Sequence, residues 1–158
     1  MNINPDKFGI CFFSTNSNHS MLKIEHIGIA VKDLEQSNNL FTKLFGKTPY
    51  KLEKVESENV STSFFMMGEN KIELLEATDS GSPIAKFIEK KGEGIHHIAF
   101  EVKDIFAEMK RLQNEGFILL SEQPKKGADN KLICFLHPKD TNGVLIELCQ
   151  EVHKDLQM

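Results

Sequence analysis

The stretch IHHIAFEV at Ile95–Val102 decides the fold, because a related stretch, IEHIGIAV, occurs at Ile24–Val31. Superposing the two places His26 on His97, and each copy then continues into Val-Lys-Asp and an apolar-periodic segment. Self-similarity at a fixed spacing indicates that a structural unit is repeated. We therefore predict two copies of one unit, with one histidine at the same position in each, and a site shared between them.

The composition is typical of an ordinary globular protein. The 158 residues suit one domain, or two half-domains with a common core, and 40% of them are hydrophobic and 27% charged. The net charge of −4 does not indicate a basic surface for binding nucleic acid. No apolar run approaches the roughly 20 residues that a membrane-spanning helix requires. Cys11, Cys134 and Cys149 form no CxxC pair, which favours a reducing cytoplasm. Cys134 and Cys149 are predicted to be small core residues.

Hydrophobic periodicity predicts the same order of elements in both copies, namely a strand, a helix and three strands. The first helix follows Asp33 and ends at Gly46, and the second spans 104–115. A polar surface loop is expected at 122–130. The predicted strands cover 22–31, 50–55, 60–67 and 71–76 in the first copy, and 95–102, 117–121, 131–136 and 143–149 in the second.

This element order predicts an α+β fold. Two βαβββ modules, at about 22–77 and 95–150, should form a partly closed barrel of curled sheets with helices outside. A helical insertion at 82–92 joins them, so that residues 21–152 make a single domain. A ferredoxin-like sandwich would need a second helix in each unit. Residues 1–20 are expected to be a loosely attached, poorly ordered arm, and residues 153–158 a tail.

The alternation of side chains along a strand separates the histidines. His26 and His97 fall on equivalent faces beside the small residues Gly28 and Ala99, which leave room for more than packing. His96 points the opposite way, toward the helices, and is predicted to be structural. A single histidine on a strand is more often a core or surface residue than a ligand. The recurrence in both copies is what favours a site.

The last strand of each copy contains a carboxylate inside an apolar run, Glu73 in KIELLE and Glu147 in GVLIELC. Burying a lone carboxylate is costly unless a cation or hydrogen bonds hold it. If both face the same hollow as His26 and His97, the site has two imidazoles and two carboxylates. Such a set suits Co²⁺, Mn²⁺, Ni²⁺, Zn²⁺ or Fe²⁺, with water completing the coordination. Alternatively, Glu73 lies on an exposed strand face.

At these residues the chain resembles the vicinal oxygen chelate superfamily, whose paired modules enclose one metal ion. Over about residues 22–151 it is similar to the methylmalonyl-CoA epimerase family. The segments HIGIAVKDL, NKIELLEA, SPIAKFIEKKGEGIHHIAFEV and HPKDTNGVLIEL carry this resemblance. It implies a divalent metal held by His26, Glu73, His97 and Glu147, and exchange between the (R) and (S) forms of methylmalonyl-CoA.

The implied reaction removes a proton from a carbon between a thioester and a carboxylate, and a cation that chelates one oxygen of each would stabilise the enolate. Glu147 is expected to be one proton-transfer group, as a metal-bound carboxylate able to loosen. The sequence does not assign the other proton-transfer group. Some relatives have a carboxylate on the strand at 60–64, but this chain has none there, so Glu73 or a water is a candidate. Only a different register would bring in Glu56 or Glu58.

The implied CoA thioester needs cations for its phosphates at the rim of the site. Lys139 and Lys126 are the expected contacts, with Lys125 and Lys131 nearby, although lysine runs are usually solvated surface. A homodimer is expected as well, because a two-module barrel leaves apolar sheet edges.

Two other functions compete. The first is glyoxalase I, which uses a similar metal site to act on hemithioacetals of glutathione. Enzymes of that kind bind the glutathione carboxylates with arginines. This chain has a single arginine, Arg111, which lies in a predicted helix. The second alternative is a metal-free binding module of the same fold, in which the four predicted ligands would be replaced or scattered.

Overall fold

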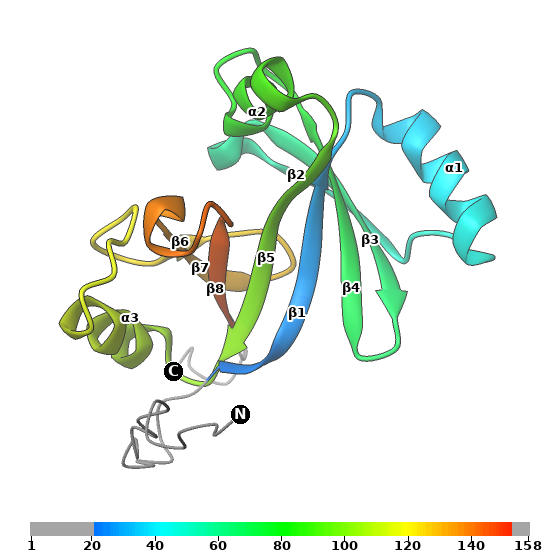
Figure 1. Ribbon diagram of the computed structural model, residues 1–158. Helices are drawn as coiled ribbons and strands as arrows, with labels where there is room; N and C mark the ends of the chain where they lie inside the picture. The colour runs from blue at the N-terminus through cyan, green and yellow to red at the C-terminus, as the bar shows by residue number, and fades with distance from the viewer. Residues whose placement is uncertain (1–20, 153–158) are drawn as a thin grey trace, which may run out of the picture.

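The computed structural model describes residues 21–152, whose path is shown in Figure 1. The strands are β1 (Met21–Ala30), β2 (Lys51–Val55), β3 (Val60–Met67), β4 (Asn70–Ala77), β5 (Gly94–Val102), β6 (Lys125–Lys126), β7 (Lys131–Leu136) and β8 (Ile146–Glu151). The helices are α1 (Leu34–Phe45), α2 (Pro83–Lys91) and α3 (Ile105–Asn114), with 3-10 turns η2 (Glu56–Glu58) and η3 (Pro138–Asp140). Cys11, the predicted arm at 1–20 and the predicted tail at 153–158 lie outside the described residues.

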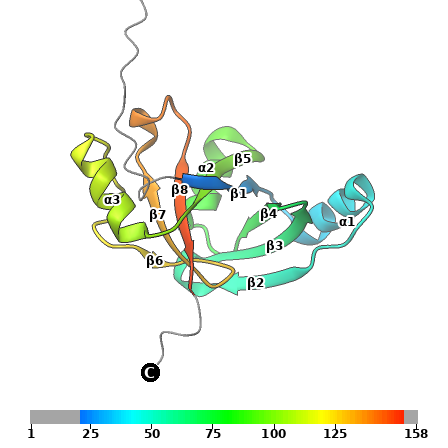
Figure 2. The same ribbon diagram turned by 90° about the horizontal axis from the view of Figure 1, so that it is seen from below.

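The eight strands form one sheet in the order β2-β3-β4-β1-β5-β8-β7-β6. Each module contributes four neighbouring strands, and the second set mirrors the first about the central antiparallel pair, β1 and β5. The sheet curls, so that its two ends approach each other, and α1 and α3 lie outside the curve (Figures 1 and 2). The predicted α+β fold of two modules in a partly closed barrel is therefore confirmed, with the two curled sheets fused into one.

The helices begin and end where capping residues allow them to. The carboxylate of Asp33 accepts a hydrogen bond from the backbone N–H of Gln36, and Asp104 does the same for Ala107 in the second copy. Gly46 ends α1 with φ of 68°, a left-handed conformation that suits glycine. The predicted helix starts are thus confirmed.

Helices α1 and α3 each cover the outer face of their own module's strands, whereas α2 packs through Ile84 on Val60 and Leu75. Leu34 of α1 packs with Phe65 and Leu74, while Ile105 of α3 packs with Cys134 and Leu148, and each such burial contributes about 1.5–3 kcal/mol. Cys134 and Cys149 are fully buried, as predicted. Among the described residues, no helix is long and apolar enough to cross a membrane.

The predicted strand at 117–121 forms only in part. Within it, Leu119 makes an isolated bridge with Leu136, while Ile118 and Leu120 remain 44% and 54% exposed. The apolar run lies along β7, where the N–H of Leu120 donates to the carbonyl of Phe135 and the N–H of His137 donates to the carbonyl of Ile118. The second strand of module two is β6, which pairs with β7 inside the segment predicted to be a surface loop.

Candidate metal centre

The pairing of β4, β1 and β5 brings the first half of the predicted site together. Gly28 of β1 lies between Glu73 of β4 and His97 of β5. A Cβ built at Gly28 would lie under 3.0 Å from three atoms of the His97 ring, closer than real Cβ atoms come. Glycine is therefore required here because the imidazole lies directly over its backbone.

The second half of the site repeats this arrangement in the other module. Ala99 of β5 lies between His26 of β1 and Glu147 of β8, and Ala99 is the copy-two equivalent of Gly28. Each histidine thus lies opposite a small residue of the other copy. One histidine and one glutamate from each module face the same hollow.

The four side chains converge closely enough to bind one ion. The Nε2 atoms of His26 and His97 lie 2.9 Å apart, and Oε2 of Glu73 lies 3.2 and 3.6 Å from them. Oε1 of Glu147 lies 3.8 Å from His26 Nε2, and Oε2 lies 3.5 Å from His97 Nε2. Ligands about 2.1 Å from a cation lie roughly 3.0–3.5 Å from one another. The buried donor set therefore fits a divalent cation.

The two carboxylates are held differently. Glu73 Oε1 accepts a hydrogen bond of 2.9 Å from the hydroxyl of Thr62 on β3, which leaves Oε2 directed at the histidines. Within residues 21–152, the polar contacts of the Glu147 carboxylate are with the two imidazole rings. Glu73 is consequently anchored by the sheet, whereas Glu147 depends on the centre itself.

The buried charges shift the pKa values of these groups. Burial lowers the pKa of His26, but its hydrogen bonds with Glu25 and Glu73 outweigh that effect and raise it to about 10. Burial, together with the positive charge of His26, holds the pKa of His97 well below its usual value. Burial also raises the pKa of Glu147 to about 8, with the negative charge of Glu73 adding to the effect while that of His26 opposes it. His26 therefore favours its charged form, whereas His97 and Glu147 favour their neutral forms.

Two further residues lie at the centre, although strand alternation alone places them on the other face of the sheet. A strict period of two would place Glu25 on the opposite face from His26, but Glu25 is buried, and its Oε2 lies 2.5 Å from Nδ1 of His26. His96, predicted to be structural and to point toward the helices, does pack on Phe87 of α2, but it also lines the hollow, and its Nδ1 lies 3.0 Å from Nδ1 of His97. A β-bulge at each position interrupts the alternation, which explains why both residues reach the hollow. The signal available in the sequence was their equivalence: each residue precedes a repeated histidine.

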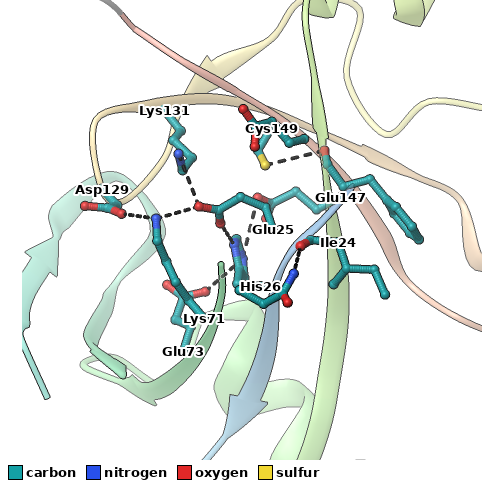
Figure 3. Close-up of polar contacts among 12 residues, drawn as sticks. Ile24, Glu25, His26, Lys71, Glu73, Asp129, Lys131, Glu147 and Cys149 are labelled. Atoms are coloured by element: carbon teal, nitrogen blue, oxygen red, sulfur yellow. Dashed lines mark hydrogen bonds and ion pairs between the residues drawn. The ribbon is translucent and has the colours of Figure 1, made fainter. Parts of the chain in front are cut away.

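Lysines hold Glu25 in place, as Figure 3 shows. Its Oε1 contacts Nζ of Lys71 at 2.5 Å and Nζ of Lys131 at 3.3 Å, and Lys71 also contacts Oδ2 of Asp129 at 2.7 Å. Glu25 and His26 also lie near the thiol of Cys149, but burial keeps the pKa of that thiol far above its usual value. Because Glu25 is already paired with Lys71, Lys131 and His26, the group of His26, His97 and Glu147 is the better metal site.

The centre forms one wall of a cavity of about 240 Å³. Glu58 of η2 lies in its lining and pairs with Lys125 of β6 at 2.6 Å, across the two modules. Glu58 needs no change of register in β3, because it lies in the turn that precedes the strand. The apolar lining includes Val60, Phe64, Leu75, Ile84, Ile133 and Phe135.

Only some of the lysines that were predicted to contact CoA lie at this cavity. Lys125 and Lys131 line it, whereas Lys126 and Lys139 lie outside its described lining. The role of Lys126 and Lys139 in binding CoA phosphates stays a prediction.

The fold agrees with comparisons to known proteins. Residues 25–135 match the family described as the Glyoxalase/Bleomycin resistance protein/Dioxygenase superfamily, and the chain belongs to that superfamily. The ethylmalonyl-CoA/methylmalonyl-CoA epimerase of Cereibacter sphaeroides is 42% identical over 130 residues, which cover 81% of this chain and 97% of the relative. Within the superfamily, the chain belongs to the methylmalonyl-CoA epimerase family.

Two more relatives cover most of the chain. The mitochondrial methylmalonyl-CoA epimerase of Homo sapiens is 39% identical over 86% of this chain and 78% of its own length. A solved methylmalonyl-CoA epimerase in complex with methylmalonyl-CoA and NH₄⁺ has a TM-score of 0.81 and 34% identity, covering 84% of this chain and 96% of that one.

Proposed function

We propose that this protein epimerises methylmalonyl-CoA at carbon 2, with a divalent cation bound by His26, His97, Glu73 and Glu147. The observation that carries the proposal is the convergence of two imidazole Nε2 atoms, 2.9 Å apart, with a buried carboxylate from each module. The family relationship supports the substrate, since relatives over most of this chain are epimerases of this thioester. When bound, the cation would act as a Lewis acid toward the substrate's thioester and carboxylate oxygens.

Glu147 is the group that we expect to take the proton from one epimer. Its contacts are limited to the centre, so its carboxylate can turn toward carbon 2 more easily than Glu73, which Thr62 holds. The C–H bond breaks, the proton goes to the carboxylate, and the electron pair is delocalised onto the thioester oxygen. Glu73, the other predicted catalytic carboxylate, is then mainly a ligand.

Glu58 is our candidate for the group on the opposite face of the enolate. It comes from module one, whereas Glu147 comes from module two, and both line the same cavity. The ion pair with Lys125 holds its carboxylate at the cavity wall. In its carboxylic-acid form, Glu58 would give its proton to carbon 2 and become the carboxylate that pairs with Lys125, which completes the inversion; in the reverse reaction the two glutamates exchange roles.

The direct test is isotope exchange. The purified protein, stripped with a chelator and reloaded with Co²⁺, Mn²⁺, Ni²⁺ or Zn²⁺ in turn, is incubated with (S)-methylmalonyl-CoA in D₂O. We expect deuterium at carbon 2 and formation of the (R) epimer, both lost after chelation. Loaded protein that gives neither product would overturn the proposal. The same assays would identify the preferred metal.

The glyoxalase alternative is disfavoured by the position of the single arginine. Arg111 lies on α3, where its Nε and Nη2 donate to Glu108 at 2.9 and 2.6 Å, and it is absent from the described cavity lining. We therefore expect no isomerisation of the methylglyoxal–glutathione adduct. A metal-free binding module is disfavoured by the four converging donors, since such buried carboxylates are costly without a cation.

We also expect a homodimer. The central strands expose large apolar side chains, with Leu22 57%, Ile24 41% and Ile95 61% exposed. Sedimentation velocity at micromolar concentration should give twice the mass of one chain. A single species with the mass of one chain would exclude the dimer.

A further inference from the structure

Two of the three register shifts in the central strand pair lie at equivalent positions of the repeat. Along β1, Ile24 pairs with Phe100 and His26 with Ala99, so that Glu25 is the extra residue. Along β5, the partners of Gly28 and Ile29 are His97 and Ile95, so that His96 is the extra residue. A bulge re-aims the side chain at its position. The residue before each central histidine is thereby turned toward that histidine.

The two extra residues contact the same atom of their neighbours. The carboxylate of Glu25 meets Nδ1 of His26 at 2.5 Å, and Nδ1 of His96 meets Nδ1 of His97 at 3.0 Å. On both rings the other nitrogen, Nε2, faces the predicted ion. In each module the bulge therefore supplies a partner for the nitrogen that faces away from the centre.

We propose that Glu25 and His96 are positioning residues that fix the tautomer and the ring orientation of the two histidine ligands. His26 donates its Nδ1–H to Glu25, and His97 donates its Nδ1–H to the unprotonated Nδ1 of His96, so that each Nε2 lone pair is free for the metal. The inference rests on the proposed metal centre. Outer partners of this kind contribute about 10- to 100-fold to metal affinity in other proteins.

The surroundings suit these roles and make the two halves chemically unequal. Glu25 is fixed by Lys71 of module one and Lys131 of module two, so its carboxylate cannot turn away from His26 without breaking two ion pairs. His96 is fixed by edge-to-face packing on Phe87 of α2, with ring centroids 5.0 Å apart. A carboxylate partner makes an imidazole more basic than an imidazole partner does. His26 should therefore be the stronger donor to the metal.

The first test measures Co²⁺ affinity by calorimetry in the full-length protein. We expect Glu25→Gln and His96→Phe each to weaken binding about 10- to 100-fold. His96→Gln, whose side-chain oxygen can accept from His97, should recover most of the loss. Glu101→Gln is the matched control on β5, outside the described cavity lining, and should bind like the parent. Parent-like affinity in both Glu25→Gln and His96→Phe would overturn the inference.

A second substitution separates positioning from general support of the fold. Lys131→Met removes a cation near the centre but leaves the Glu25 carboxylate on His26. We expect it to lose less Co²⁺ affinity than Glu25→Gln, because Lys71 still holds the Glu25 carboxylate on His26. If Lys131→Met and Glu25→Gln weaken binding alike, the cluster only supports the fold and the inference fails.

The parent protein provides a test that needs no variant to fold. In the Zn²⁺-loaded, ¹⁵N-labelled protein, both His26 and His97 should show a protonated, slowly exchanging Nδ1 and a metal-bound Nε2. Coordination through Nδ1 on either ring would refute the assignment. If the parent binds Zn²⁺ in this way but does not epimerise the thioester, the proposed function fails and the positioning roles stand. Absence of metal binding by the parent would remove both.

Discussion

The backbone of Gly28 on β1 lies directly beneath the imidazole ring of His97 on β5. The two residues are paired across the centre of the sheet, and a Cβ at Gly28 would be under 3.0 Å from three ring atoms. This close approach joins the two modules at the metal centre. The position of His97 therefore depends on the absence of a side chain in the other copy.

Gly28→Ala should displace His97 and reduce both metal affinity and epimerisation by at least about tenfold, since metal affinity falls by about 10- to 100-fold even when only an outer partner of a ligand is lost. The matched control is Ala99→Gly at the equivalent position of the second copy. It removes a methyl group and should cost about 0.5–1 kcal/mol of stability, with Co²⁺ affinity nearly unchanged. Calorimetric titration and thermal melts measure the two effects separately. Equal metal affinity in Gly28→Ala and the parent would contradict the geometry.

Glu147→Gln should stabilise the metal-free fold while lowering epimerisation about 10²- to 10⁴-fold. Burial raises the pKa of Glu147 from 4.5 to about 8, so the folded protein binds this proton more tightly than the unfolded chain does. Ionisation of Glu147 therefore destabilises the folded protein, and this destabilisation grows as pH rises from about 4.5 to 8. With a chelator present, the variant should melt a few degrees above the parent at pH 8 and close to it at pH 4.5, since about 1 kcal/mol shifts the midpoint by about 2–4 °C. A lower melting temperature at pH 8 would contradict this.

The repeat made the four predicted ligands accessible from sequence. Equivalent positions in two modules related about β1 and β5 must converge, and this holds for His26, His97, Glu73 and Glu147. The same logic explains why the predicted helices and most of the strands have the expected order.

The sequence could not place the residues that depend on irregular backbone. Glu25 and His96 lie at bulges, which a strict period of two cannot anticipate. Glu58 enters the cavity from a 3-10 turn that ends at Asn59, a residue with φ of 52°. The segment at 117–121 has the apolar pattern of a strand, but its outward side chains, Ile118 and Leu120, are exposed to solvent.

Asp129 should make the fold sensitive to acid. It contacts Lys71 at 2.7 Å and Lys51 at 3.1 Å, and although burial opposes the shift, these lysines hold its pKa below the usual value. A lowered folded-state pKa means that the stabilisation is present above the unfolded pKa, about 3.9, and is lost as pH falls through the folded value. In urea titrations, Asp129→Asn should be less stable than the parent at pH 7, and the difference should shrink below about pH 4. A difference independent of pH would argue against ionic stabilisation.

Glu147 and Glu58 should each serve one epimer, because they approach carbon 2 from different modules. If Glu147→Gln blocks removal of the proton from one epimer, that epimer stops exchanging with D₂O, while the other still loses its proton to Glu58. Glu58→Gln should give the opposite pattern, and both variants should lose epimerisation about 10²- to 10⁴-fold, the usual contribution of a general base.

Glu56→Gln is the matched control in the same turn, since Glu56 is exposed and pairs with Lys54, and it should behave like the parent. Exchange is followed by proton NMR with each pure epimer. If Glu58→Gln exchanges both epimers at the parent rate, the second proton-transfer group lies elsewhere, and Glu73 or a water becomes the candidate to test next.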